Sequence, residues 1–330
     1  TYSEFNITLD RTGNERNAII EAMESAVADL QKCVPINVFE YDTEQYNTVF
    51  EYELDEYGVQ VAKEGLENLR VSAPYVLAIL REIEEISIEN TGEKYRYKQD
   101  ISCNLENAIV SEITYEVNGR KESIYVLKLS EGNISVMIAL KHNESGMQIF
   151  PFSEQQSKLF CDFPLIGTED FPFPVIISSP DFNPTEPRDG VFLICNNKSR
   201  TDNEIEENRR IIKTAHELYS KLLSYAAEKK WDGIYNITKI DCYSKKEWYD
   251  LEWLEEVVNK CKEVILHTPI IHTEQGNMVA LLDWFDDEQV FVISDRSSDI
   301  REKIWELTSY IMPNSIPRKE DLHKWYNSLC

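Results

Sequence analysis

The chain has 330 residues, with 34 Lys or Arg against 59 Asp or Glu, so its formal net charge is −25. This length fits two or three domains, and 42% hydrophobic residues supply enough apolar side chains for buried cores. Nucleic acids and anionic membrane surfaces bind clustered cations, so we exclude both as main partners of so acidic a chain.

The N-terminal part predicts helices with one strand between them. A helix over about residues 14–33 is indicated by apolar side chains at helical spacing, and Pro35 ends it. Its stripe consists of Ile19, Ile20, Met23, Val27, Leu30 and Val34. A strand over 47–53 and a weaker helix over 57–69 follow. Pro74 suits the first turn of a separate short helix that runs to Leu80.

From about residue 83 to 151 the pattern changes to a period of two. Ile113, Tyr115 and Val117 alternate with polar residues, and Asn118-Gly119 is typical of a tight hairpin turn. A return strand over 122–129, a turn over 131–133 and another alternating run from Ile134 follow. The sequence therefore predicts an antiparallel β-meander with one buried face.

The next stretch is irregular and rich in proline and aromatic residues. Residues 163–177 read FPLIGTEDFPFPVII, and residues 182–190 read FNPTEPRDG before a strand predicted over 191–195. Loops of this length are uncommon inside a compact chain and often carry function.

The C-terminal third predicts helices with short strands between them. Thr201 and Glu204 form a capping-box pattern for a long helix, and Ser244 and Glu247 form one for a second helix that carries Trp248. We expect short strands near 270, over 278–282 and over 290–293. Two helices, near 300–311 and 318–328, complete the prediction.

Cysteine usage and hydropathy indicate a cytoplasmic protein. The seven cysteines are odd in number and widely spaced, without a CxxC motif, so we expect thiols in a reducing compartment. No stretch approaches the roughly 18–20 apolar residues of a membrane span, and no signal-peptide pattern is present. The chain opens at Thr1 rather than Met, as in a processed product, a tagged protein or a fragment.

Most motifs that carry chemistry are missing from the sequence. The eleven glycines form neither a GxxxxGK[ST] loop nor GxGxxG nor DxGxG, so the chain shows no recognisable nucleotide cradle. His267 and His272 near Glu274 are weak metal-ligand candidates. An acidic cluster consists of Asp283, Asp286 and Asp287. It suggests a metal-dependent hydrolase, which we rank behind the two hypotheses described below.

Arg188 is the candidate site residue. It lies between Glu186 and Asp189, in a segment with two prolines and a terminal glycine. An arginine held in this way suits bidentate phosphate binding or the role of an arginine finger. The alternative is a local ion pair with Glu186 or Asp189 that stiffens the turn.

The two irregular motifs resemble a known family. FPLIGTEDFPFPVII and FNPTEPRDG are similar to segments of bacterial sacsin-like, heat-shock-protein-90-like ATP-binding proteins of the gyrase/chaperone/histidine-kinase/MutL (GHKL) ATPase superfamily. APYVLAIL at 73–80, IEEISI at 83–88, residues 248–268 and IPRKEDLHKW at 316–325 also look similar. The resemblance covers roughly residues 70–330, the region that follows the ATPase domain.

This resemblance implies a fold and a role. The fold is α+β, an antiparallel β-meander with packed helices of the ribosomal-protein-S5-domain-2-like kind, followed by a smaller α/β unit. The expected domains are 1–70, 71–240 and 241–330. The role is that of a middle, or transducer, region that is not catalytic alone, with Arg188 on the γ-phosphate. ATP and Mg²⁺ are expected only with an upstream ATPase domain in cis.

A second hypothesis is an acidic protein-interaction module without enzymatic activity. Its docking residues would be the exposed tryptophans Trp248, Trp253, Trp284 and Trp325, for which the alternative is a place in the core. The expected partners are the upstream domain, a protein client and a second copy of the chain, with neither nucleic acid nor membrane.

Overall fold

A computed structural model describes residues 2–3, 10, 13, 15–32, 35–36, 53–89, 91–143, 146–194, 202–240, 243–282 and 290–329. The chain divides into two compact units, Thr1–Val59 and Gln60–Cys330. The predicted domain boundaries at residues 70 and 240 stay predictions.

The first unit contains one long helix. β1 (Tyr2–Ser3) pairs antiparallel with β2 (Pro35–Ile36), and α1 (Arg16–Gln31) lies between them in the chain, which confirms the predicted helix. Only Ala26 of α1 is buried, and the stripe residues within α1 are exposed, namely Ile19, Ile20, Met23, Val27 and Leu30; Val34 lies outside the described residues. Residues 47–52 of the predicted strand lie outside the described residues.

The two helices predicted around Pro74 are one helix, α2 (Glu56–Ile79), with Pro74 inside it. A proline within a helix removes one backbone hydrogen bond and costs about 3 kcal/mol. The turns around it are fully packed, since every residue from Ser72 to Ala78 is buried. Packing of this half of α2 therefore outweighs the local preference that predicted a break.

A nine-stranded sheet forms the centre of the second unit, and the chain is of the α+β class. Its strands are β3 (Glu85–Ile88), β4 (Glu93–Ser102), β5 (Ala108–Val117), β6 (Arg120–Glu131), β7 (Ile134–Asn143), β8 (Gly146–Ile149), β9 (Leu159–Cys161), β10 (Phe163–Pro164) and β11 (Ile176–Ser178). Strands β3 to β8 pair antiparallel in succession, which confirms the meander. Asn118 and Gly119 have φ of 50° and 75°, as their hairpin turn requires.

The proline-rich stretch contributes strands that the sequence pattern did not predict. β11 pairs antiparallel with β7 and parallel with β9, so it lies between them in the sheet. The strand predicted over 191–195 is reduced to a single bridge between Val191 and Pro184, and Cys195 lies outside the described residues.

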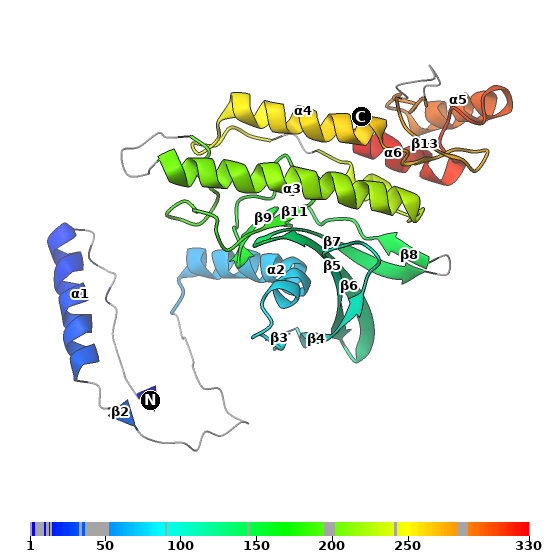
Figure 1. Ribbon diagram of the computed structural model, residues 1–330. Coiled ribbons are helices and arrows are strands. Elements are labelled where there is room, and N and C mark those ends of the chain that lie inside the picture. The colour runs from blue at the N-terminus through cyan, green and yellow to red at the C-terminus, as the bar shows by residue number, and fades with distance from the viewer. Residues whose placement is uncertain are drawn as a thin grey trace. The chain divides into compact units, whose positions relative to one another are not determined.

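Helices cover both faces of the sheet, so the prediction of a single buried face was wrong for its central strands (Figure 1). α3 (Asp202–Glu228) packs on one face, and α4 (Leu251–His267) packs on α3. The second half of α2 covers the other face. Side chains of β7 alternate accordingly: Ile138 belongs to the larger core below α3, and Met137 belongs to the smaller core below α2.

Further elements complete the C-terminal part. They are the 3₁₀ helix η1 (Ile234–Ile237), β12 (Ile271–His272), β13 (Met278–Val279), α5 (Ser298–Ile311), η2 (Lys319–Asp321) and α6 (Leu322–Leu329). Trp305 of α5 belongs to a separate small cluster with Ile293, Ile316 and Leu322. The strand predicted over 290–293 does not pair with another strand. Trp325 of α6 is 1% exposed and joins the core that includes the sheet. Within the described residues, no helix has the length and apolar character needed to cross a membrane.

Candidate functional site

Arg188 lies on the surface of an ordered loop, residues 182–193. Its backbone is left-handed, with φ of 58°, and its side chain is exposed. One guanidinium nitrogen, Nη2, donates to the carbonyl oxygen of Cys161 at 3.0 Å. Thr185 closes the turn: its Oγ1 donates to Asp189 Oδ1 at 2.5 Å and accepts from the Asp189 backbone N–H at 3.0 Å. The loop thus fixes the Arg188 backbone while the guanidinium stays accessible.

The thiol of Cys161 lies close to this guanidinium. Burial raises the pKa of the Cys161 thiol, and a hydrogen bond and the positive charge of Arg188 act in the opposite direction. The net pKa lies above its ordinary value, so the thiol is neutral near pH 7. Arg188 therefore contacts a neutral thiol and a carbonyl here.

Asn208 of α3 holds the two ends of the loop. It is fully buried, its Oδ1 accepts from the Asn183 backbone N–H at 2.8 Å, and its Nδ2 donates to the carbonyls of Asn183 and Phe192 at 3.0 Å each. Every hydrogen-bonding group of the amide except its second lone pair is thereby used. The loop that carries Arg188 is consequently fastened to the first half of α3.

The next residue, Arg209, extends this connection to α4. Its Nη2 donates to the Leu193 carbonyl at 2.7 Å and pairs with the Asp250 carboxylate at 2.5 Å. Asp250 is the N-cap of α4 and accepts from the Trp253 backbone N–H at 3.1 Å. The same carboxylate thus caps the N-terminus of α4 and pairs with Arg209 of α3.

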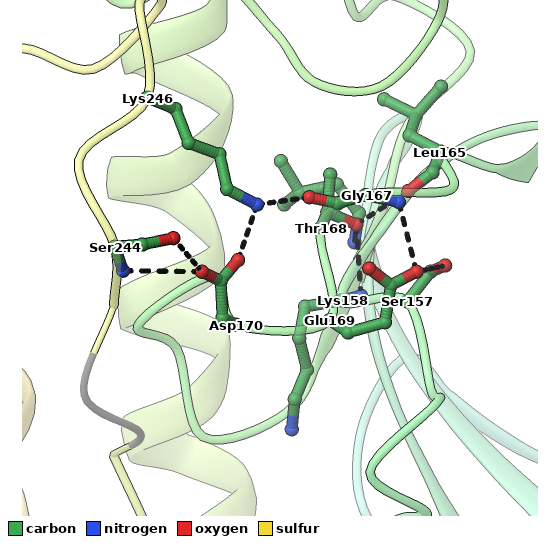
Figure 2. A network of polar contacts seen from close by, with 10 residues as sticks. Ser157, Lys158, Leu165, Gly167, Thr168, Glu169, Asp170, Ser244 and Lys246 are labelled. Carbon is green, nitrogen blue, oxygen red and sulfur yellow. Dashed lines mark hydrogen bonds and ion pairs between the residues drawn. The ribbon is translucent and has the colours of Figure 1, made fainter.

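Ser244 does not cap a helix, contrary to the prediction. Its N–H and hydroxyl both donate to Asp170 Oδ2, at 3.3 and 2.8 Å, and Lys246 donates to Asp170 Oδ1 and to the Gly167 carbonyl (Figure 2). Because this long-range pairing takes the serine side chain, the helix starts seven residues later, after Asp250.

The 163–177 segment is organised by buried side-chain hydrogen bonds. Thr168 is fully buried, and its Oγ1 accepts from the N–H groups of Lys158 and Leu159 and donates to the Leu165 carbonyl at 2.8 Å. Glu169 accepts from Ser157 and from the Gly167 N–H at 2.9 and 3.0 Å (Figure 2). These contacts hold residues 165–175, between β10 and β11, which form no strand of their own.

Two glycines bring the segments together. A Cβ on Gly167, which has φ of +107°, would lie 3.2 Å from the Asp189 Cβ. A Cβ on Gly190 would lie 2.1 Å from Cε2 of Trp248, whose ring stacks on Phe171 with centroids 6.2 Å apart. Residues 161–173, 182–193 and 243–250 therefore form one packed unit, which we call the loop cluster.

Three of the four tryptophans expected to dock partners are core residues. Trp248 is 6% exposed, Trp253 is 9% exposed and Trp325 is 1% exposed. That expectation was wrong for these three, because their large rings are buried in the larger hydrophobic core. Trp284 lies outside the described residues.

The candidate metal ligands do not assemble in the part of the chain that the structure describes, where no group of three His, Cys, Asp or Glu side chains is placed to hold an ion. His267 Nδ1 contacts the Leu282 carbonyl at 3.0 Å. Burial and the nearby Arg318 lower the pKa of His272. Asp283, Asp286 and Asp287 lie outside the described residues. Cys103, Cys161 and Cys261 carry free thiols.

Sequence reasoning selected Arg188, whose role stays a prediction, but missed the residues that hold its loop. The sequence could have indicated Asp170, because it lies inside the motif that carries the resemblance. It could not have indicated Asn208, because a polar residue within an amphipathic helix ordinarily faces solvent. Comparisons with protein-family models, curated proteins and solved structures find no match to this chain.

Proposed function

We propose that this chain is the middle, transducer-like region of a chaperone-type GHKL ATPase of the sacsin-like kind, with a ribosomal-protein-S5-domain-2-like fold. It is inactive alone and couples the nucleotide state of an upstream ATPase domain to movement of its own helices. ATP and Mg²⁺ belong to that upstream domain. One observation carries the proposal: Arg188 is exposed on a loop fastened to both α3 and α4.

The chemistry of Arg188 suits a γ-phosphate. A guanidinium has five N–H donors in a planar fork, and one contact to the Cys161 carbonyl orients it while other donors remain for phosphate oxygens. Its charge attracts the anion without a proton transfer, since arginine stays protonated in proteins. Arg188 acts here as a binding and sensing group.

The contacts around the loop supply a route for coupling. A displacement of Arg188 moves the turn closed by Thr185, and Asn208 transmits that displacement to α3 because it holds both ends of the loop. The ion pair between Arg209 and Asp250 carries it on to the N-terminus of α4. Ligand binding shifts a conformational equilibrium only through such differential contacts.

The first test is the reading frame upstream of Thr1. The proposal expects an ATPase domain there, with an Asn-bearing helix and a DxGxG loop. An upstream frame that encodes no such domain would contradict it.

The second test is ATP turnover of the protein that carries both regions. Arg188→Ala should lower turnover by about a hundredfold to a thousandfold, the range seen when one charge-stabilising donor is lost. Arg188→Lys keeps the positive charge but lacks the forked donors of guanidinium, so its ATP turnover should lie between those of the unmodified protein and Arg188→Ala. Arg96→Ala, which removes an exposed arginine paired with Glu85, is the matched control. Unchanged turnover of Arg188→Ala would overturn the arginine role.

A second candidate function is the acidic protein-interaction module, with α5 in place of the tryptophans. Ile300, Leu307 and Ile311 of α5 are 45%, 69% and 77% exposed, beside a hollow of about 580 Å³ that Ile304 and Met312 line. Exposed apolar patches of this kind mark interaction sites. A partner of this module should bind saturably, and Leu307→Ser or Ile311→Ser should weaken that binding. Finding no such partner would contradict this candidate.

A further inference from the structure

The α2 face of the sheet contains a cavity that the proposed function does not use. It has a volume of about 380 Å³ and lies between α2, strands β4 to β7 and the segment after β8. Five aromatic rings line it: Tyr75, Tyr95, Tyr115, Phe150 and Phe152. Tyr95 and Tyr115 stack with centroids 4.8 Å apart, and Tyr75 and Phe152 stack at 6.4 Å.

The aromatic rings favour a cation. Ring faces carry partial negative charge, so they attract a guanidinium or ammonium group. Phe152 already contacts one, since the ammonium of Lys158 lies 4.1 Å from its centroid. Burial raises the pKa of the Tyr95 and Tyr115 hydroxyls, which keeps both rings neutral at ordinary pH.

Charged side chains surround the mouth of the cavity as ion pairs. Arg70 pairs with Glu67 and with Glu93 at 2.8 Å, and Lys141 pairs with Glu122 at 2.9 Å. With Lys158 beside Phe152, three cations and three carboxylates lie at or next to the cavity, so its local charge is balanced. The side chains of Glu67 and Glu122 remain 49% and 59% exposed, which leaves oxygen lone pairs accessible to a further donor. The net charge of −25 disfavours an anionic ligand.

Guanidinium fits this environment better than ammonium. It is flat, weakly hydrated and stacks on aromatic rings, while its forked donors reach carboxylates. A cavity of about 380 Å³ is at the small end of ligand sites and accommodates one long side chain. Phe150 is 49% exposed and adds apolar surface at the cavity. The main chain that flanks a bound arginine would pack on this surface.

We propose that this aromatic pocket binds an arginine side chain presented by a polypeptide. The proposal is independent of Arg188 and of the upstream ATPase domain, because the lining of the pocket includes neither Arg188 nor a residue of α3.

Fluorescence anisotropy with the 330-residue chain tests it. The probe is a labelled nonapeptide of Gly and Ser with one central arginine, compared with the same peptide carrying citrulline, the neutral isostere. The arginine peptide should bind saturably, and citrulline should weaken binding by about tenfold or more, as loss of a desolvated cation–aromatic contact predicts. Equal affinity of the two peptides, or no binding of either, would overturn the proposal.

Two variants locate the binding site. Glu122→Gln should weaken the arginine peptide about threefold, since it removes one exposed carboxylate. Glu131→Gln is the matched control, because Glu131 lies on the same strand β6 and pairs with Lys221 at 3.6 Å, outside the lining of the pocket. Equal effects of the two variants would place binding elsewhere. Tyr115→Leu should weaken binding about tenfold, and circular dichroism checks its fold.

A third comparison identifies the source of the arginine. Nα-acetyl-arginine amide has the side chain without the flanking main chain, and we expect it to bind at least about tenfold more weakly than the peptide, since it lacks the contact with Phe150. Phe150→Ser should remove that difference. If the amide binds as tightly as the peptide, the pocket takes a small guanidine and the polypeptide proposal is wrong.

Discussion

The two faces of the central sheet use the same strands in different ways. On the α3 face, residues such as Ile138, Ala215 and Leu222 are fully buried in one continuous core. On the α2 face, Met137 and Ala139 contribute to a smaller core that leaves a cavity of about 380 Å³. One face thus gives rigidity to the loop cluster and the other leaves room for a ligand. The alternating pattern predicted one buried face, and an apolar side chain in a strand does not show whether its surroundings are closely packed or contain a pocket.

The largest effect should come from Asn208→Ala on the α3 face. It leaves the Asn183 N–H and the carbonyls of Asn183 and Phe192 without their present partner in a buried place, which costs about 3 kcal/mol. Urea unfolding measures the loss. Asn133→Ala is the control, since its exposed amide makes one bond of 3.2 Å to Asp181. A loss below about 1 kcal/mol would mean that the loop is held by other contacts.

A matched pair of larger side chains tests the difference in packing directly. Ala215→Leu in α3 should destabilise the fold by about 1–3 kcal/mol, because its site is fully packed. Ala139→Leu should cost less than about 1 kcal/mol, because Ala139 lines the cavity and the added carbons enter it. Thermal unfolding of both variants measures the difference. Equal losses would show that both faces are packed alike.

The pH dependence of the loop cluster should report on Asp170. Burial acts to raise the pKa of Asp170, but the hydrogen bonds from Lys246 and Ser244 outweigh it, so its pKa lies below the ordinary value. A lowered pKa in the folded state means that the ionised carboxylate stabilises the fold above about pH 4 and loses this effect as pH falls through the folded pKa.

Asp170→Asn should therefore cost about 1 kcal/mol at pH 7, since the Asp170 side chain is 31% exposed. Urea unfolding should give the same difference at pH 5.5 and a smaller one at pH 3.5. A difference that already shrinks between pH 7 and pH 5.5 would contradict the lowered pKa.

The smallest effect should be the stability change at Arg188. Arg188→Ala should alter the free energy of unfolding by less than about 1 kcal/mol, because the side chain is exposed. Arg188→Gly should be more stable than Arg188→Ala by about 1 kcal/mol, since the left-handed φ of 58° is strained for alanine. Chemical denaturation resolves both. A loss above about 2 kcal/mol in Arg188→Ala would make Arg188 a structural residue rather than an exposed site.

Local signals predicted the meander and α3. The Asn118-Gly119 turn and the alternation from Ile113 to Val117 are properties of neighbouring residues, and the structure confirms both. Long-range contacts decided the rest. Pro74 lies inside α2 because its surroundings are packed, and Ser244 bonds with Asp170, 74 residues earlier in the chain. A capping-box pattern contains no information about such a competing partner.

The position of β11 has a consequence for the order of folding. Strands β4 to β7 are joined by short turns, so their pairing closes short loops and should be rapid. β11 must bridge about forty residues to reach β7, and β9, with the edge strand β10, joins the sheet through β11. The loop that carries Arg188 follows directly after β11. We therefore expect this loop to be completed last, and Asn208→Ala to speed unfolding while leaving the refolding rate unchanged. Molecules that present an ordered Arg188 would then be those whose sheet is already complete.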